Sequence, residues 1–146
     1  MENPGEAGRG IKGERGFGHE RLVVYRRALE FYGRVLGLVR PLARRDARLA
    51  DQLQRAAASV PLNIAEGAGE FRPAEKARFY RIALRSATEC AAVLDLMRLQ
   101  ANGHDPCPAT RAILSEIVAM LTRLANLPPP SPSPSNSPSN SSSNSN

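Results

Sequence analysis

The sequence holds few of the residues that usually build catalytic centres, metal sites and disulfides. It contains no tryptophan, two histidines and two cysteines, and the cysteines do not form a CxxC pair. Cys90 stands among apolar residues, so we expect it in a hydrophobic core. The segment "HDPCP" brings His104, Asp105 and Cys107 close together, but three such residues in a proline-bounded turn are a weak indication of a metal site. The sequence therefore predicts reduced cysteines and no bound metal.

Residue patterns typical of enzymes are also missing. Glu66 and Glu89 could form a carboxylate pair, but no histidine accompanies them in the helical pattern. No serine or cysteine nucleophile arrangement is present, and Gly67 and Gly69 follow a predicted helix instead of opening one as a phosphate-binding loop does. We therefore expect no catalytic residues, no cofactor and no enzymatic activity.

Long apolar runs are absent as well. No run reaches the length of a transmembrane helix, and the N-terminus lacks a charged region followed by an apolar one. The sequence predicts a cytoplasmic, soluble protein with no membrane partner.

Both ends of the chain have compositions that cannot form a core. Residues 1–19 contain six glycines and as many acidic as basic residues, and residues 128–146 contain only proline, serine and asparagine. Such segments bury too little apolar area to offset the entropy lost on ordering them, so we expect both to be disordered. Residues 20–127 remain as one small domain.

Positive charge is in excess, and it is carried by arginine. The formal net charge is +6, and it falls on residues 20–127 because both ends are neutral. All but two of the 20 basic residues are arginine, which favours an anionic partner, nucleic acid before a membrane surface. A genome rich in G and C could explain arginine in place of lysine, but it does not explain the excess of positive charge.

Apolar residues recur at helical spacing, with no strand-like alternation. The first predicted helix ends at Pro41, and Asp46 can cap a second. Pro73 suits the first turn of a third, and a fourth begins near Ala109. Four helices with short connections predict an all-α, antiparallel, up-down-up-down four-helix bundle.

The predicted apolar stripes indicate which faces form the core. The first helix has two neighbouring stripes, Leu22, Tyr25, Leu29, Tyr32, Leu36, Val39 and Ala28, Phe31, Val35, Leu38, Leu42. The other helices present Leu49, Leu53, Ala56, Val60, Ile64, then Phe79, Ile82, Ser86, Glu89, Val93, Leu96 flanked by Ala83, Ala87, Cys90, Leu94, Met97, then Ile113, Ile117, Met120, Leu124. The apolar residues of the first and fourth helices cover more than one core requires, so part of this surface is expected to contact another subunit.

The stretch "SVPLNIAEGAGE", residues 59–70, interrupts the second helical pattern. Pro61 removes one backbone hydrogen bond and clashes with the carbonyl four residues before it, so the helix either ends at Ser59 or kinks and continues to Glu66. The apolar pattern continues at Val60 and Ile64, which favours a kinked helix that is stopped by the following glycines.

Polar residues on the second and third helices face one another in this arrangement. We expect an internal hydrogen-bond network that fixes the register between the two helices. Its members are Gln52, Arg55, Ser59, Asn63, Glu66, Ser86 and Glu89.

Two arginine clusters are candidates for contact with nucleic-acid phosphates. One is Arg44, Arg45 and Arg48, and the other is Arg78, Arg81 and Arg85. The alternative is a solvated or locally paired surface, because acidic residues stand at helical spacing: Asp51 from Arg48, Glu75 from Arg78, and Glu89 from Arg85.

The segments "QLQRAAASVPLNIAEGAG" (52–69) and "FYRIALRSATECAAVLDL" (79–96) carry a resemblance to a known family. They resemble the bacterial four-helix-bundle proteins encoded in 23S rRNA intervening sequences, and also the accessory variability protein of diversity-generating retroelements. The resemblance extends over about residues 22–125 and rests chiefly on Asn63-Ile64-Ala65-Glu66-Gly67 behind Ser59-Val60-Pro61. Glu70 and Phe71 depart from the family pattern, in which a basic or small polar residue often follows Gly69.

The resemblance implies a four-helix bundle that assembles into a ring-shaped homopentamer and binds nucleic acid. With the basic composition, it leads us to expect a non-enzymatic oligomer that binds RNA or DNA through arginines without sequence specificity. The alternative is a protein-interaction scaffold or accessory subunit, for example for a reverse transcriptase.

Overall fold

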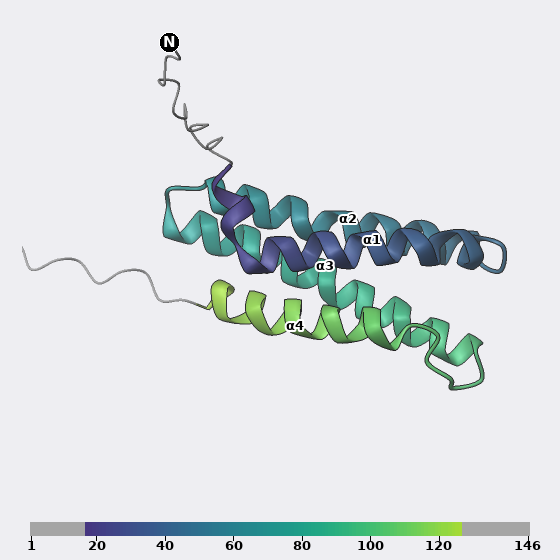
Figure 1. Ribbon diagram of the computed structural model, residues 1–146. Helices are drawn as coiled ribbons and strands as arrows, with labels where there is room; N and C mark the ends of the chain where they lie inside the picture. The colour runs from purple at the N-terminus through teal and green to yellow at the C-terminus, as the bar shows by residue number, and fades with distance from the viewer. Residues whose placement is uncertain (1–16, 127–146) are drawn as a thin grey trace, which may run out of the picture.

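The helices of the chain form a bundle in which each helix runs antiparallel to the one before it (Figure 1). The structure, a computed structural model, describes residues 17–126, so the disorder expected for residues 1–16 and 128–146 lies outside this range, whereas residues 18 and 19, also expected to be disordered, belong to a short 3-10 helix. The elements are η1 (Gly18–Arg21), α1 (Val23–Ala43), α2 (Ala47–Gly69), α3 (Pro73–Gln100) and α4 (Pro108–Ala125). Residues 17–126 contain no strand, so the all-α four-helix prediction is confirmed.

The helices pack in the order of the chain and close into a bundle. α2 packs against α1 and α3, and α4 packs against α3 and α1. The connections 44–46 and 70–72 are short, and the connection 101–107 is longer. Within residues 17–126, no helix combines the length and the apolar character that crossing a bilayer requires.

The ends of α2 and α3 follow the local signals of the sequence. Asp46 caps α2, because its Oδ1 accepts a hydrogen bond of 3.0 Å from the backbone N–H of Leu49. Pro73 occupies the first turn of α3, where a missing N–H loses no helical hydrogen bond. Pro41, predicted as the end of the first helix, lies inside the last turn of α1. In a helix, a proline ring crowds the carbonyl four residues before it. Only two residues of α1 follow Pro41, so this disturbance lies at the C-terminal end of the helix.

The second helix continues through Pro61, which is buried, and ends at Gly69. Gly67, predicted to stop this helix, lies inside it and is buried against Tyr80 of α3. A Cβ atom at Gly67 would lie 2.8 Å from Tyr80 Cε1 and 3.2 Å from the Lys76 carbonyl oxygen. The glycine is therefore required by the close approach of two helices.

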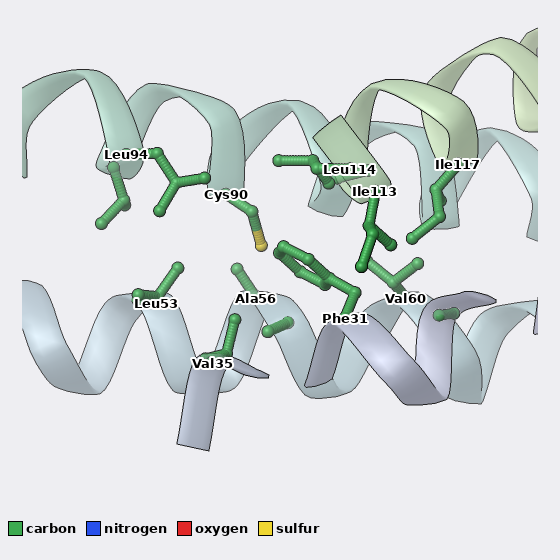
Figure 2. Close-up of a cluster of buried hydrophobic side chains, with 14 of the residues drawn as sticks. Phe31, Val35, Leu53, Ala56, Val60, Cys90, Leu94, Ile113, Leu114 and Ile117 are labelled. Carbon is green, nitrogen blue, oxygen red and sulfur yellow. The ribbon is translucent and has the colours of Figure 1, made fainter. Parts of the chain in front are cut away.

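The core contains side chains from all four helices (Figure 2). Phe31 of α1 lies beside Cys90 of α3, and Val60 of α2 and Ile117 of α4 border the same cluster. The expected burial of Cys90 is confirmed. In α2 the predicted stripe is the buried one throughout.

In the other helices the buried stripe is displaced from the prediction. The core face of α1 is the second of its two stripes, and Leu29 and Leu36 of the first are exposed. The core face of α3 is centred on the stripe predicted to flank it. Ser86 and Val93 of the main predicted stripe are also buried, whereas Glu89 and Leu96 are exposed. In α4, Leu114, Leu121 and Ala125 are buried, and Met120 and Leu124 pack at the edge of the core. No large apolar side chain of α4 is strongly exposed, so the excess apolar surface expected on the fourth helix is not found there.

Candidate nucleic-acid interface

A hydrogen bond between neutral side chains joins α2 to α3 near the middle of their contact. The Ser86 hydroxyl donates to Ser59 Oγ at 2.9 Å. The Asn63 amide nitrogen donates to the Ser59 carbonyl at 2.8 Å and to Ser59 Oγ at 3.0 Å. Ser86 is buried and the other two are half-buried; the Ser86–Ser59 bond links the helices at one defined register, and the Asn63 bonds hold Ser59 from within α2.

A second bridge lies closer to the N-terminus of α2. Gln52 Nε2 donates to Glu89 Oε1 at 3.1 Å. Arg55, expected in the same network, instead pairs with Asp51 on its own helix at 2.9 Å, because both side chains lie in solvent one turn apart. Glu66 is exposed and lines a shallow depression with His19, so it is also outside the network. The structure therefore brings together Gln52 with Glu89, and Ser59 with Asn63 and Ser86.

The α3 arginine line, defined as Arg78, Arg81 and Arg85, lies on the outer face of the helix. The spacing of three and four places the three side chains on one side, and all three are exposed. Arg78 is 3.4 Å from Glu75, but no carboxylate of residues 17–126 lies within 4.0 Å of Arg81 or Arg85. Glu89, one turn from Arg85, accepts its hydrogen bond from α2.

The second cluster, Arg44, Arg45 and Arg48, lies at the turn between α1 and α2. All three side chains are exposed and no carboxylate of the described residues forms an ion pair with them. Asp46 accepts a backbone hydrogen bond from α2 and a 3.5 Å contact from a glutamine at the end of α3. Asp51 pairs one turn further along its own helix. The cluster is at the opposite end of α2 from the turn that precedes the α3 arginine line.

The arginines between α1 and α4 are in a different environment. Arg27 Nη1 lies 2.9 Å from Glu30, and its Nη2 lies 2.9 Å from Glu116 of α4. Arg34 lies 3.5 Å from Glu30. The hydrogen bond from Arg27 lowers the pKa of the Glu30 carboxyl below its ordinary value. Sequence spacing indicates the Arg27–Glu30 pair, but the partner on α4 follows only from the fold.

The "HDPCP" segment ends the connection between α3 and α4, and only its last residue, Pro108, belongs to α4. Asp105 accepts from the backbone N–H of Cys107 at 3.0 Å and from Arg111 Nε at 3.1 Å, and both donors lower the pKa of its carboxyl. Arg111 also reaches Asp95 of α3 at 2.8 Å, while His104 is exposed. No group of three or more histidine, cysteine or acidic residues within residues 17–126 could hold a metal ion. These residues fix the connection between α3 and α4.

The Cys90 thiol faces the core beneath the α2–α3 contact. Burial raises its pKa to about 12, and the nearby Glu89 carboxylate acts in the same direction. A thiol held neutral at physiological pH is a weak nucleophile and a weak metal ligand. Its contribution is therefore apolar packing.

Comparisons with known proteins agree with this geometry. A model of the 23S rRNA-intervening sequence protein family matches residues 20–123. A solved structure, described as a protein with unknown function from the S23 ribosomal protein family of Bacteroides thetaiotaomicron VPI-5482, is 23% identical, with a TM-score of 0.67. The match covers 72% of this chain and 100% of that one, and at this identity it shows a shared fold. No curated protein matches the chain.

Proposed function

Because this chain belongs to the 23S rRNA-intervening sequence protein family, we propose that it is a non-enzymatic oligomer that binds RNA or DNA. The contact would come from the α3 arginine line and would be made to phosphates. The family is named for a segment of ribosomal RNA genes, which is in keeping with a nucleic-acid partner but does not identify it.

The observation that carries the proposal is the state of Arg81 and Arg85. Both side chains are exposed, and no carboxylate of residues 17–126 lies within ion-pair distance of either. An arginine without an acidic partner can replace the counterions of a phosphate, which supplies most of the free energy of non-specific binding. Over Arg78 to Arg85 the helix rises about 10 Å, so the line can follow several phosphates of one strand.

The proposed binding does not read sequence. Guanidinium contacts to phosphate oxygens position a nucleic acid without distinguishing its bases. Arg44, Arg45 and Arg48 offer a second exposed basic surface at the other end of α2. A long nucleic acid could contact both clusters, and a short one would contact the α3 arginine line first.

Assembly into a homopentamer is the second part of the proposal. Leu29 and Leu36 of α1 remain 46% and 47% exposed, and they belong to a stripe with the three-and-four spacing by which helices pack together. This surface supports contact with another copy of the chain. Five copies of the 15.8 kDa chain have a mass of 79 kDa, which sedimentation equilibrium would detect. A monomer at micromolar concentration would contradict this part alone.

A salt titration tests the proposed binding. Affinity for duplexes of unrelated sequence should fall alike as salt rises, with each phosphate contact contributing about −0.9 to the log–log slope. Replacing Arg78, Arg81 and Arg85 with glutamine should flatten the slope by about two to three units while the melting temperature and oligomer mass stay unchanged. An unchanged slope in an intact oligomer would remove the line from the binding surface, and Arg44, Arg45 and Arg48 would be replaced next.

A second candidate function, binding of a protein partner, is favoured by an apolar hollow. A cavity of about 270 Å³ lies where the C-terminal ends of α1 and α3 meet, and Leu38, Leu42 and Met97 are among the residues that line it. A reverse transcriptase is one candidate for the partner. This function predicts that Leu38→Asp abolishes complex formation with a purified partner, whereas the triple glutamine variant of the α3 arginine line leaves it intact.

A further inference from the structure

Phe71 stands in the turn between α2 and α3 with almost no contact to the rest of the bundle. It is 97% exposed, the highest value among the large apolar side chains of residues 17–126. Most large apolar side chains are buried because water disfavours their surface. Packing between the helices gives no reason for an aromatic ring at this position.

The segment of the chain that contains Phe71 is basic. Residues 70–81 contain four basic and two acidic residues, and Arg72, next to Phe71, is exposed. Of the acidic pair, Glu75 lies 3.4 Å from Arg78, and Glu70 is half-buried and lines the depression beside His19. The Arg78 guanidinium carbon lies 5.6 Å from the centroid of the Phe79 ring, so this cation already lies against an aromatic ring.

An exposed aromatic ring in the turn that leads into a helix with a row of exposed arginines matches the chemistry of single-stranded nucleic acid. Such a strand leaves its bases free to stack on aromatic side chains, while its phosphates follow a basic surface. A duplex keeps its bases paired and stacked, so it could use the arginines but not the ring. Stacking on a ring is also tolerant of sequence, since every base has two flat faces.

We infer that Phe71 is a base-stacking residue and that the strand continues from it along the α3 arginine line. This inference rests on the proposed nucleic-acid function and adds a substrate class, single-stranded RNA or DNA. A protein partner is less suited to this position. Anchors of protein interfaces lie in patches from which charged residues are depleted, whereas charged residues flank Phe71 on both sides in the chain.

Truncation of the ring tests the inference. The probes are an oligodeoxythymidine of about 16 nucleotides, the upper site size of small single-strand binders, and its duplex with oligodeoxyadenosine. Phe71→Ala should lower affinity for the single strand about tenfold and change affinity for the duplex less than about twofold. Leu99→Ala is the matched control, since Leu99 is 72% exposed at the other end of α3. It should change neither affinity.

A tryptophan at this position reports contact directly, because the chain contains no other. Phe71→Trp should retain binding, and its fluorescence should be quenched as the single strand saturates the protein, whereas Leu99→Trp should not be quenched. Emission typical of a buried indole before any oligonucleotide is added would overturn the inference, because another copy of the chain would then cover the ring.

The outcomes also separate this inference from the proposed function. If the arginine variants lose affinity while Phe71→Ala binds the single strand as wild type does, the proposed function stands and the inference fails. If wild-type protein binds neither probe, both fail.

Discussion

The contact between α2 and α3 and the contact between α1 and α4 are closed by different chemistry. Between α2 and α3, Ser86 donates to Ser59 and Gln52 donates to the Glu89 carboxylate, and a glycine of α2 lies directly against a tyrosine of α3. Between α1 and α4 the bridge is an ion pair, Arg27 to Glu116, extended on α1 by Glu30. Side chains therefore bridge both contacts, but of the two only the α1–α4 contact uses an arginine.

This difference decides where positive charge is available. An exposed ion pair contributes little to stability, about 0–1 kcal/mol, yet it cancels the field of its arginine. The bridges between α2 and α3 use serines and a glutamine in place of arginine, and their one carboxylate, Glu89, accepts from Gln52. Arg81 and Arg85 are therefore left without a carboxylate partner among residues 17–126. The net charge of +6 is thus unevenly distributed over the molecule.

The largest loss of stability is expected from Gly67→Ala. The new Cβ atom would lie 2.8 Å from a ring carbon of the buried Tyr80, so the helices must separate at a cost of about 1–3 kcal/mol. Gly33→Ala is the matched control, because a Cβ atom at this exposed position of α1 meets nothing within 4 Å. It should stabilise the helix by up to about 1 kcal/mol. Urea unfolding of both variants checks this, and equal effects would show that the two glycines do not differ.

A smaller loss is expected from Ser86→Ala, which removes the hydrogen bond to Ser59 across the α2–α3 contact. The cost should be about 1 kcal/mol. Ser115→Ala, on the exposed surface of α4, should change the free energy of unfolding by less than about 0.5 kcal/mol. If Ser86→Ala unfolds at the wild-type urea concentration, the neutral bridge does not hold the register.

Removing the carboxylates of the α1–α4 contact should leave its arginines without acidic partners, as Arg81 and Arg85 of α3 are among residues 17–126. In Glu30→Gln with Glu116→Gln, Arg27 and Arg34 lose their partners, and stability should change little because these ion pairs are exposed. Nucleic-acid binding should instead gain up to two phosphate contacts per subunit, steepening the log–log salt slope by about 1 to 2. A slope equal to that of wild type would show that Arg27 and Arg34 do not contact the nucleic acid even when they are unpaired.

At neutral pH the smallest effect is that of Cys90 ionisation, which is absent there and appears only in alkaline solution. Its pKa is raised from 9.0 to about 12 by burial, so between these values the unfolded chain loses a proton that the folded chain keeps. Stability from this thiol is therefore complete below pH 9 and declines as pH rises toward 12, by up to about 1.4 kcal/mol per unit. Cys90→Ala should show a shallower decline in urea unfolding across this window, and parallel curves would mean that the thiol is not protected.

Local signals predicted where α2 and α3 begin, but not every helix end or every buried face. Asp46 as a cap and Pro73 in a first turn depend only on neighbouring residues, and both were predicted. α1 offers two adjacent apolar stripes, and which one faces the core depends on where α2 and α4 lie. Gly67 was predicted as a stop because sequence alone does not show that Tyr80 lies against it.

The sequence predicted which arginines make up the candidate interface, but not which of them form ion pairs with neighbouring carboxylates. Spacing allowed Arg48 with Asp51 and Arg85 with Glu89 as readily as Arg78 with Glu75. Only the last pair forms, because Asp51 has Arg55 as a second neighbour and Glu89 meets a glutamine from α2. Several ion pairs at helical spacing have similar energies, and the positions of the other helices determine which of them form.

The most direct test compares two double variants that remove the same charge from different faces. Salt slopes would be measured by fluorescence anisotropy on one labelled duplex for Arg81→Gln with Arg85→Gln and for Arg27→Gln with Arg34→Gln. If the unpaired arginines of α3 contact the phosphates, the α3 variant flattens the slope by about two units, whereas the α1 variant leaves it as in wild type. Equal flattening by both variants would show that net charge, and not the unpaired arginines of α3, governs binding.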